Sequence, residues 1–238
     1  PQGKPFSTSN ELEFFPAWWL PEAHSQTLWN ARVRRVPSVN LLEETLELPD
    51  QDFLEWFWLR DTYEASAEVP TILILHGLEG CARSNYVQDL MRQLGSLGWR
   101  TVVMQYRNCG EKPNRLAQSY HAMRWQELDW TVANLRGRFP GAPIGVVGFS
   151  IGGSILLNWL GQNEIKNIVA ACAISVPYKL APCADRLNRG FSKIYQTYLM
   201  GRLKRSAVRK WDLLKDALGL SDLSQINKLN TLWEFDDL

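Results

Sequence analysis

The sequence predicts an α/β fold with a mostly parallel sheet, a leading antiparallel hairpin and a helical lid. Three observations predict it. Two strand-like segments come first, separated by a short polar turn; apolar strand-like runs then alternate with segments of helical period; and the pattern becomes wholly helical beyond Pro182. Parallel strands joined by helices can close only into a sheet that helices cover on both faces.

The predicted hairpin lies near the start of the chain. Residues 42–48 alternate apolar and polar side chains, and residues 53–59 are rich in aromatic side chains. The segment Pro49-Asp50-Gln51-Asp52 between them is typical of a turn. We therefore expect two antiparallel strands at these positions.

The alternating part begins with Thr71–Leu75, a continuous apolar run typical of a strand that is buried on both faces. It leads into a His76-Gly77 loop. The later elements that we expect are helix 84–97, strand 101–106, helix 120–139, strand 144–149, a helix after residue 150 and a further buried strand at 168–176. Four strands thus alternate with three helices.

The 238 residues, 45% of them hydrophobic, suffice for one large domain with a substantial core. We divide them into an N-terminal arm (1–40), a core (41–180), a helical lid over the site (181–220) and a segment that begins the return to the core (221–238). The arm is rich in aromatic residues, among them Trp18, Trp19 and Trp29. It either packs on the sheet or anchors the chain at a lipid interface.

Composition narrows the class of protein. No apolar run approaches the roughly 18 to 20 residues of a membrane span, and no secretory pattern opens the chain. The four cysteines lack CxxC spacing, which argues against zinc and a disulfide framework. We therefore expect a cytoplasmic protein with no metal, no organic cofactor and no nucleic-acid partner. The oligomeric state stays open.

The net charge is +1, but the predicted lid is locally basic. Between residues 186 and 210 there is no acidic residue and there are eight basic ones: Arg186, Arg189, Lys193, Arg202, Lys204, Arg205, Arg209 and Lys210. Apolar residues at helical spacing run between them. The segment is either a solvated basic face over a buried apolar stripe or a weak contact with anionic lipid or a phosphorylated substrate.

The segment Gly148-Phe149-Ser150-Ile151-Gly152 carries the chemistry. It follows an apolar strand and opens an apolar helix, which is the context that a nucleophilic serine in a GxSxG turn requires. The glycines allow a turn in which any Cβ would clash, so Ser150 is exposed at its corner. The N–H of Ile151 at the helix start then points to the oxyanion position. This geometry suits acyl transfer.

The chain resembles the α/β-hydrolase superfamily, and within it the YheT-type branch related to mammalian lipid hydrolases with ABHD names. Six segments carry the resemblance: 23–28 (AHSQTL), 76–80 (HGLEG) with 84–86 (SNY), 107–110 (RNCG), 148–153 (GFSIGG), 175–177 (SVP) and 231–237 (TLWEFDD). The resemblance implies a serine hydrolase that cleaves a small carboxylic ester, acyl or lipid-like, through an acyl-enzyme on Ser150. It also implies that Leu78 and Ile151 supply the oxyanion-hole N–H groups.

The sequence departs from this branch in two places. Asn108 stands where the branch usually has Gly, in a turn that tolerates φ > 0 in either residue. The three histidines, His24, His76 and His121, all precede Ser150, although the family order is nucleophile, acid, histidine. Without an imidazole nearby, a serine hydroxyl is a weak nucleophile, so the chain alone is expected to be nearly inert.

The resemblance implies that the last strands, with the triad Asp and His, follow Leu238 and that the chain stops early. The alternative is a recruited histidine, His76 being nearest; its competing role is to brace the oxyanion loop. We assign none of the later aspartates to the triad: Asp185, Asp212, Asp216, Asp222, Asp236 and Asp237. Two rival functions are an acyltransferase with the same intermediate and an inactive hydrolase-fold module that binds lipid or protein.

Overall fold

The computed structural model describes residues 15–162 and 168–238. The chain divides into two compact units, residues 1–36 and 37–238. In the first unit, α1 (Ala23–Leu28) continues into a short π-helix, η1 (Trp29–Val33). The rings of Trp19 and Trp29 meet edge to face at 4.6 Å, whereas Trp18 is 90% exposed. Residues 1–14 of the predicted arm lie outside the described residues, and both roles considered for the arm stay predictions.

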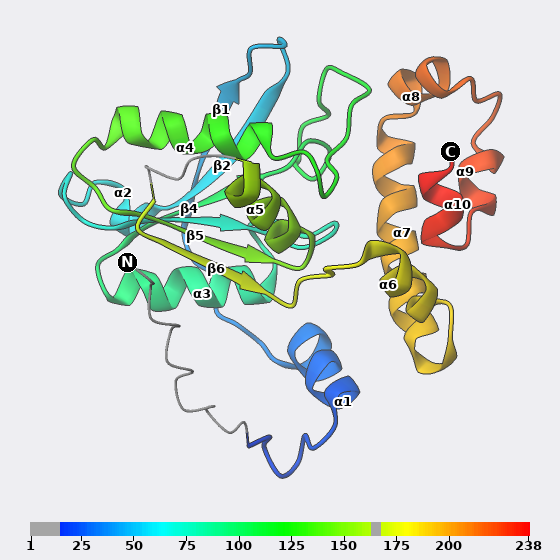
Figure 1. Cartoon of the computed structure of the whole chain (residues 1–238), viewed down its shortest axis with the longest axis horizontal. Helices are drawn as coiled ribbons and strands as arrows, with labels where there is room; N and C mark the ends of the chain where they lie inside the picture. The colour runs from blue at the N-terminus through cyan, green and yellow to red at the C-terminus, as the bar shows by residue number, and fades with distance from the viewer. Residues whose placement is uncertain (1–14, 163–167) are drawn as a thin grey trace, which may run out of the picture. The chain divides into compact units, whose positions relative to one another are not determined.

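The second unit is built on a six-stranded sheet (Figure 1). Its strands are β1 (Leu41–Glu47), β2 (Phe53–Leu59), β3 (Thr71–Leu75), β4 (Arg100–Gln105), β5 (Ile144–Phe149) and β6 (Ala170–Ile174). They lie in the order β1-β2-β4-β3-β5-β6. The β1–β2 and β2–β4 pairs are antiparallel, and the other three pairs are parallel. The predicted hairpin and the mostly parallel sheet are therefore confirmed.

Helices cover both faces of the sheet. The connections carry α2 (Arg60–Tyr63), α3 (Asn85–Ser96), α4 (Gln126–Arg138) and α5 (Ile151–Gln162). One buried cluster joins α4 and α5 to the sheet through side chains such as Leu128 and Trp159, and a second joins α3 through Val87 and Met91. The two clusters lie on opposite faces because side chains alternate along a strand: Leu73 belongs to the first and Ile74 to the second. Burial on both sides explains the continuous apolar runs in the sequence.

Two sequence predictions need correction. The helix expected at 120–139 begins only at Gln126, because Tyr120 turns into the core and the chain makes a turn in which the Arg124 N–H donates to the His121 carbonyl. The strand expected to be buried at 168–176 is β6, which forms one edge of the sheet and is largely exposed. Val169, just before it, is 72% exposed. The apolar composition of this segment predicted a strand correctly, but it could not show that the strand lies at the edge of the sheet.

After β6 the described chain is helical. It forms α6 (Leu180–Leu187), the 3₁₀ turn η2 (Gly190–Ser192), α7 (Lys193–Arg209), α8 (Trp211–Leu218), α9 (Ser224–Lys228) and α10 (Leu232–Asp236). In Figure 1 these helices, yellow to red, lie beyond the carboxyl ends of the parallel strands. No helix of the described residues is long and apolar enough to cross a membrane.

Helix α7 is attached to the loop that follows β4. Ser206 Oγ donates a hydrogen bond to the Asn108 carbonyl at 3.0 Å, and Arg209 donates to the Asn108 and Gly110 carbonyls. Lys210 Nζ donates to the Leu116 carbonyl at 3.0 Å. The apolar stripe expected in the basic segment 186–210 is divided. Leu203 of α7 is buried, whereas Phe191 of η2 and Ile194 and Tyr198 of α7 are exposed. Basic residues of α7 thus meet the core instead of forming only a solvated face.

Candidate active site

Ser150 occupies the turn between β5 and α5 with φ = 53°, the left-handed region that non-glycine residues rarely adopt. The flanking glycines make this turn possible. A Cβ on Gly148 would lie 2.5 Å from the Gly152 carbonyl oxygen, and a Cβ on Gly152 would lie 2.6 Å from the His76 carbonyl oxygen. The chain segments therefore approach one another more closely than any side chain permits, as the sequence predicted.

The backbone of Ser150 is held on both sides, while its hydroxyl is left unused. Its N–H donates to the Ile174 carbonyl at the end of β6, and its carbonyl accepts from the Ser154 N–H. Ser150 is partly exposed, and Oγ makes no hydrogen bond to any described residue. The fold thus fixes the backbone of Ser150 and leaves its hydroxyl without a hydrogen bond to the described residues.

The loop after β3 lies directly against Ser150, since a Cβ added to Gly77 would lie 3.3 Å from Ser150 Cβ. Two tyrosines hold this loop: the Gly77 N–H donates to the Tyr86 hydroxyl at 2.8 Å, and the Glu79 N–H donates to the Tyr120 hydroxyl at 2.7 Å. The N–H of Leu78, between them, donates to no described residue. The N–H of Ile151 likewise has no acceptor among the described residues. Neither of the two N–H groups predicted as oxyanion donors is therefore used by a described residue.

His76 lies at the end of β3, but both of its ring nitrogens face backbone groups. Nδ1 is 2.8 Å from the Gly77 carbonyl oxygen, and Nε2 is 3.5 Å from the Tyr106 nitrogen. Complete burial lowers the pKa of this imidazole to about 4, so the ring is neutral near pH 7. The arrangement matches a brace for the loop. His121 lies exposed in the turn before α4, and no described imidazole hydrogen-bonds to Ser150.

Left-handed backbone recurs after every parallel strand. Besides Ser150 after β5, the non-glycine residues with positive φ include Glu79 after β3 (52°), Asn108 after β4 (72°) and Ser175 after β6 (53°). Such conformations cost about 1 kcal/mol or more each and cluster at functional sites. Here they gather at the carboxyl edge of the sheet, where ligands of open α/β sheets bind. Asn108 fulfils the expectation that its turn accepts φ > 0.

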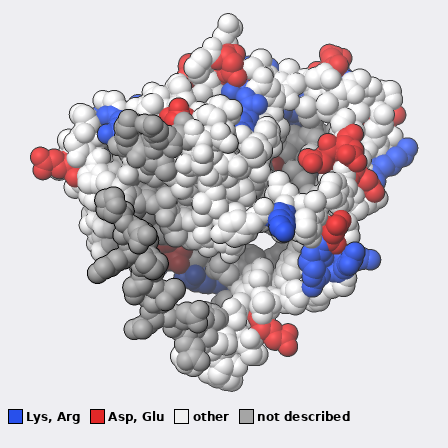
Figure 2. Space-filling view, viewed as in Figure 1, with Lys and Arg blue, Asp and Glu red and all other residues white. Residues whose placement is uncertain are grey.

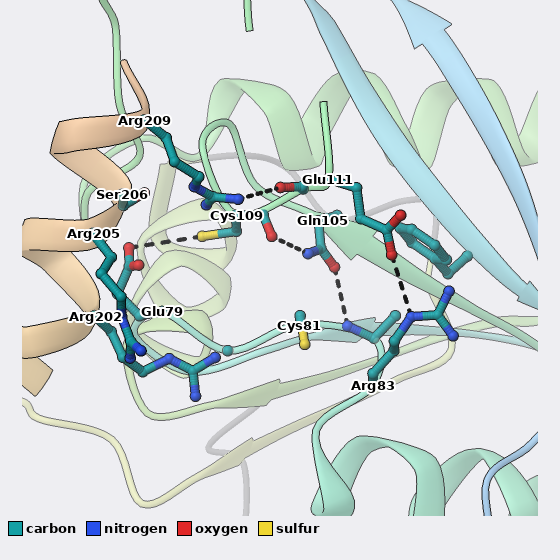
Figure 3. Close-up of a pocket in the computed structure, with 14 residues that line it drawn as sticks. Glu79, Cys81, Arg83, Gln105, Cys109, Glu111, Arg202, Arg205, Ser206 and Arg209 are labelled. Atoms are coloured by element: carbon teal, nitrogen blue, oxygen red, sulfur yellow. Dashed lines mark hydrogen bonds and ion pairs between the residues drawn. The ribbon is translucent and has the colours of Figure 1, made fainter. Parts of the chain in front are cut away.

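A cavity of about 510 Å³ opens at the same edge, between α7 and the loops after β3 and β4 (Figure 3). Glu79 and Gly80, next to Leu78, form part of its wall. Ser150 is not among the residues that line it. The cavity is therefore a neighbour of the Ser150 turn and shares one loop with it.

Comparison with known proteins agrees with the fold described above. Residues 70–235 match the family model described as "alpha/beta hydrolase fold". The chain belongs to the α/β-hydrolase family. A crystal structure of the Pyrococcus furiosus esterase Pf2001 shares the fold, with a TM-score of 0.52 and 19% identity over 71% of each chain.

Relatives place this α/β hydrolase in the YheT/ABHD branch. It is 34% identical over 232 residues to "Putative esterase YheT" of Escherichia coli (strain K12), covering 97% of this chain and 67% of that protein. It is 28% identical over 228 residues to phospholipase ABHD3 of Mus musculus, covering 94% of this chain and 55% of that protein. The chain thus spans between about half and two thirds of the length of these relatives.

Proposed function

We propose that this α/β hydrolase carries the nucleophile of a serine hydrolase that cleaves carboxylic esters with an acyl or lipid-like part. The observation that carries the proposal is the Ser150 turn. Its backbone is left-handed, its Oγ makes no hydrogen bond to a described residue, and the N–H groups of Leu78, in the loop after β3, and of Ile151, at the start of α5, have no described acceptor. The names of two relatives support the substrate class, since one is a phospholipase and another, from Saccharomyces cerevisiae, a monoacylglycerol lipase.

The proposed chemistry has two steps. Ser150 Oγ attacks the ester carbonyl while a base takes its proton; the C–O bond to the alcohol breaks, the alcohol leaves with that proton, and an acyl-enzyme remains. Water then attacks the acyl carbon and gives a proton to the same base; the bond between that carbon and Ser150 Oγ breaks, the acid leaves, and Oγ takes the proton back. In both steps the negative charge develops on the carbonyl oxygen, where the Leu78 and Ile151 N–H groups would stabilise it.

The base is proposed to come from outside these 238 residues. His76 is neutral, but its nitrogens are directed at Gly77 and Tyr106, so it lacks the geometry of a general base for Ser150. Asp185, considered above, accepts a hydrogen bond from Trp233, and Asp212 pairs with Lys215, which places both among the helices after β6. The test therefore needs the full-length protein.

Labelling of the full-length protein with a fluorophosphonate tests the nucleophile. We expect one adduct, on Ser150, and parallel hydrolysis of nitrophenyl esters. Ser150→Ala should abolish both, whereas Ser154→Ala, a serine one helical turn later in α5, should retain both. An unlabelled Ser150 would favour the inactive binding module. Transfer of the acyl group to an added alcohol faster than to water would favour the acyltransferase.

A further inference from the structure

Four arginines line the cavity beside the Ser150 turn. Its walls carry Arg83 from the loop after β3 and Arg202, Arg205 and Arg209 from α7 (Figure 3). The carboxylates that line it are Glu79 and Glu111. Even with both carboxylates ionised, the cavity keeps an excess of positive charge. By contrast, Figure 2 shows acidic and basic side chains interspersed over the visible face of the molecule.

Two of the four arginines already have protein partners for their guanidinium groups. Arg83 pairs with Glu111 at 3.4 Å between Nε and Oε1, and Arg209 donates to the carbonyl oxygens of Asn108 and Gly110. These contacts hold the two loops and α7 together. They account for Arg83 and Arg209 without a ligand.

Arg202 and Arg205 are different. They lie three residues apart on α7, so their side chains share one face of the helix. Arg202 donates to the Tyr198 hydroxyl at 2.6 Å, and Arg205 donates to the Gly201 carbonyl at 3.1 Å. Neither forms an ion pair with a carboxylate of the described residues. Each guanidinium keeps most of its five N–H donors for another acceptor.

Neutralisation of Glu79 is the simplest alternative role for these arginines. Glu79 is buried and accepts a hydrogen bond from the Tyr120 hydroxyl at 3.1 Å. Burial raises the pKa of its carboxyl, which the positive charges of Arg202, Arg209 and Arg205 partly oppose. The single carboxylate of Glu79 does not need the charges of all three arginines for its neutralisation. The excess charge therefore suits an anion that is not part of the described chain.

We propose that this cavity binds a phosphate group through Arg202 and Arg205. Guanidinium groups match the oxygens of a phosphate in pairs of hydrogen bonds, and helix α7 presents two of them side by side. A cavity of about 510 Å³ also leaves room for the molecule to which the phosphate is attached. The phosphate belongs either to an ester substrate that reaches Ser150, which rests on the function proposed above, or to free inorganic phosphate.

Calorimetric titration of the full-length protein with inorganic phosphate tests the site itself. We expect binding that weakens with added salt and that is at least about tenfold weaker in Arg202→Gln/Arg205→Gln, since charge-assisted hydrogen bonds are lost. Arg189→Gln/Lys193→Gln, which removes two exposed positive charges outside the cavity, should bind as the unmodified protein does. The proposal would be overturned if the unmodified protein did not bind phosphate, or if Arg202→Gln/Arg205→Gln, the cavity variant, bound it equally well.

Two further measurements keep the outcome decisive. If the double variant does not fold, Arg205→Gln alone, at an exposed position, is judged by the same criterion with a loss of about threefold expected. Ser150→Ala should still bind phosphate, because Ser150 does not line the cavity. Loss of hydrolysis and loss of phosphate binding can therefore be observed separately.

Steady-state kinetics identify the source of the phosphate. The KM of a short-chain glycerophospholipid is compared with the KM of a neutral nitrophenyl ester in the cavity variant and in the Arg189→Gln/Lys193→Gln control. If the ratio of the phospholipid KM to the neutral-ester KM rises about tenfold in Arg202→Gln/Arg205→Gln but not in the control, the site binds the phosphate of the substrate. An unchanged ratio, with phosphate binding retained by the unmodified protein, assigns it to inorganic phosphate.

Discussion

At the scale of single residues, the Ser150 turn depends on the absence of two side chains. Gly148 and Gly152 are packed against backbone atoms of neighbouring segments, and backbone cannot move aside as a flexible side chain can. The geometry that exposes Oγ is therefore a property of the glycines as much as of the serine.

Gly148→Ala should destabilise the protein by about 3 kcal/mol or more, since overpacking against backbone forces the turn open. Urea unfolding measures this change. Gly201→Ala is the matched control, because a Cβ there meets nothing within 4 Å and the residue lies inside α7. It should be neutral or stabilise by up to about 1 kcal/mol. Equal stability of the two variants would contradict the packing described for the turn.

His76 should make the stability of the protein depend on pH. Its pKa falls from about 6.5 in the unfolded chain to about 4 in the fold, so below pH 6.5 the unfolded state binds a proton that the folded state refuses. Between pH 7 and pH 5 this difference should remove about 2 kcal/mol of stability.

Urea unfolding at the two pH values measures this contribution. His76→Asn should lose the dependence attributed to this residue, whereas the exposed His121→Asn should keep it. If His76→Asn and the unmodified protein lost the same stability between pH 7 and pH 5, the neutral buried ring would be excluded.

The sequence predicts the Ser150 turn well because GxSxG, the strand before it and the helix after it are all local. It left the role of His76 open between a base and a brace. Deciding between them needs the positions of Gly77 and Tyr106 around the ring, and Tyr106 is 30 residues away. Such partners cannot be derived from spacing alone.

At the scale of elements, the loop between β3 and α3 is the part that positions Leu78. It is held from one side by Tyr86 of α3 and from the other by Tyr120, which precedes α4. The sequence placed Tyr120 in a helix because apolar residues recur there at helical spacing. In the structure its hydroxyl instead accepts a hydrogen bond from the Glu79 N–H, 41 residues earlier in the chain. A local sequence pattern cannot predict a contact over that separation.

Tyr120→Phe should therefore impair catalysis more than folding. It leaves the Glu79 N–H without its acceptor, an effect of about 1–3 kcal/mol, and frees the loop beside Leu78. In full-length protein we expect kcat to fall about tenfold with little change in KM, because the oxyanion donor that we propose at Leu78 would act mainly in the transition state. Tyr63→Phe, at the far end of the sheet, is the control. A drop confined to KM would show that the loop serves binding instead.

At the scale of the whole molecule, Arg107 joins three distant parts of the chain. Its guanidinium pairs with Asp50 and Asp52 in the hairpin turn at 2.7 and 3.0 Å, and with Glu127 of α4 at 2.6 Å. Both Arg107 and Asp52 are buried. The hairpin, the loop after β4 and α4 are thereby connected through one side chain.

Arg107→Ala should destabilise the protein by about 3–5 kcal/mol, because it leaves buried carboxylates unpaired. Arg92→Ala, which breaks an exposed pair with Asp89, should change stability by less than about 1 kcal/mol. Chemical unfolding of both variants gives the comparison. A loss below 1 kcal/mol for Arg107→Ala would show that the network contributes little.

The leading hairpin and the parallel pairing follow from the alternation of strands and helices, so the fold class was predictable. The strand order β1-β2-β4-β3-β5-β6 was not, because the same alternation is compatible with several orders. The exposure of β6 was not, because an apolar run is compatible with an edge as well as with the centre of a sheet. The arginine-lined cavity could not be predicted either. The sequence shows the basic segment 186–210, but which residues of α7 face the core depends on how the helix packs.

The left-handed backbone of Ser150 has a consequence for engineering. Glycine adopts φ = 53° without penalty, so Ser150→Gly would relieve backbone strain while removing the oxygen that we propose as the nucleophile. A library screened for thermal tolerance alone should accumulate glycine at this position. Such a screen would raise thermal stability and remove the proposed hydrolytic activity through the same substitution.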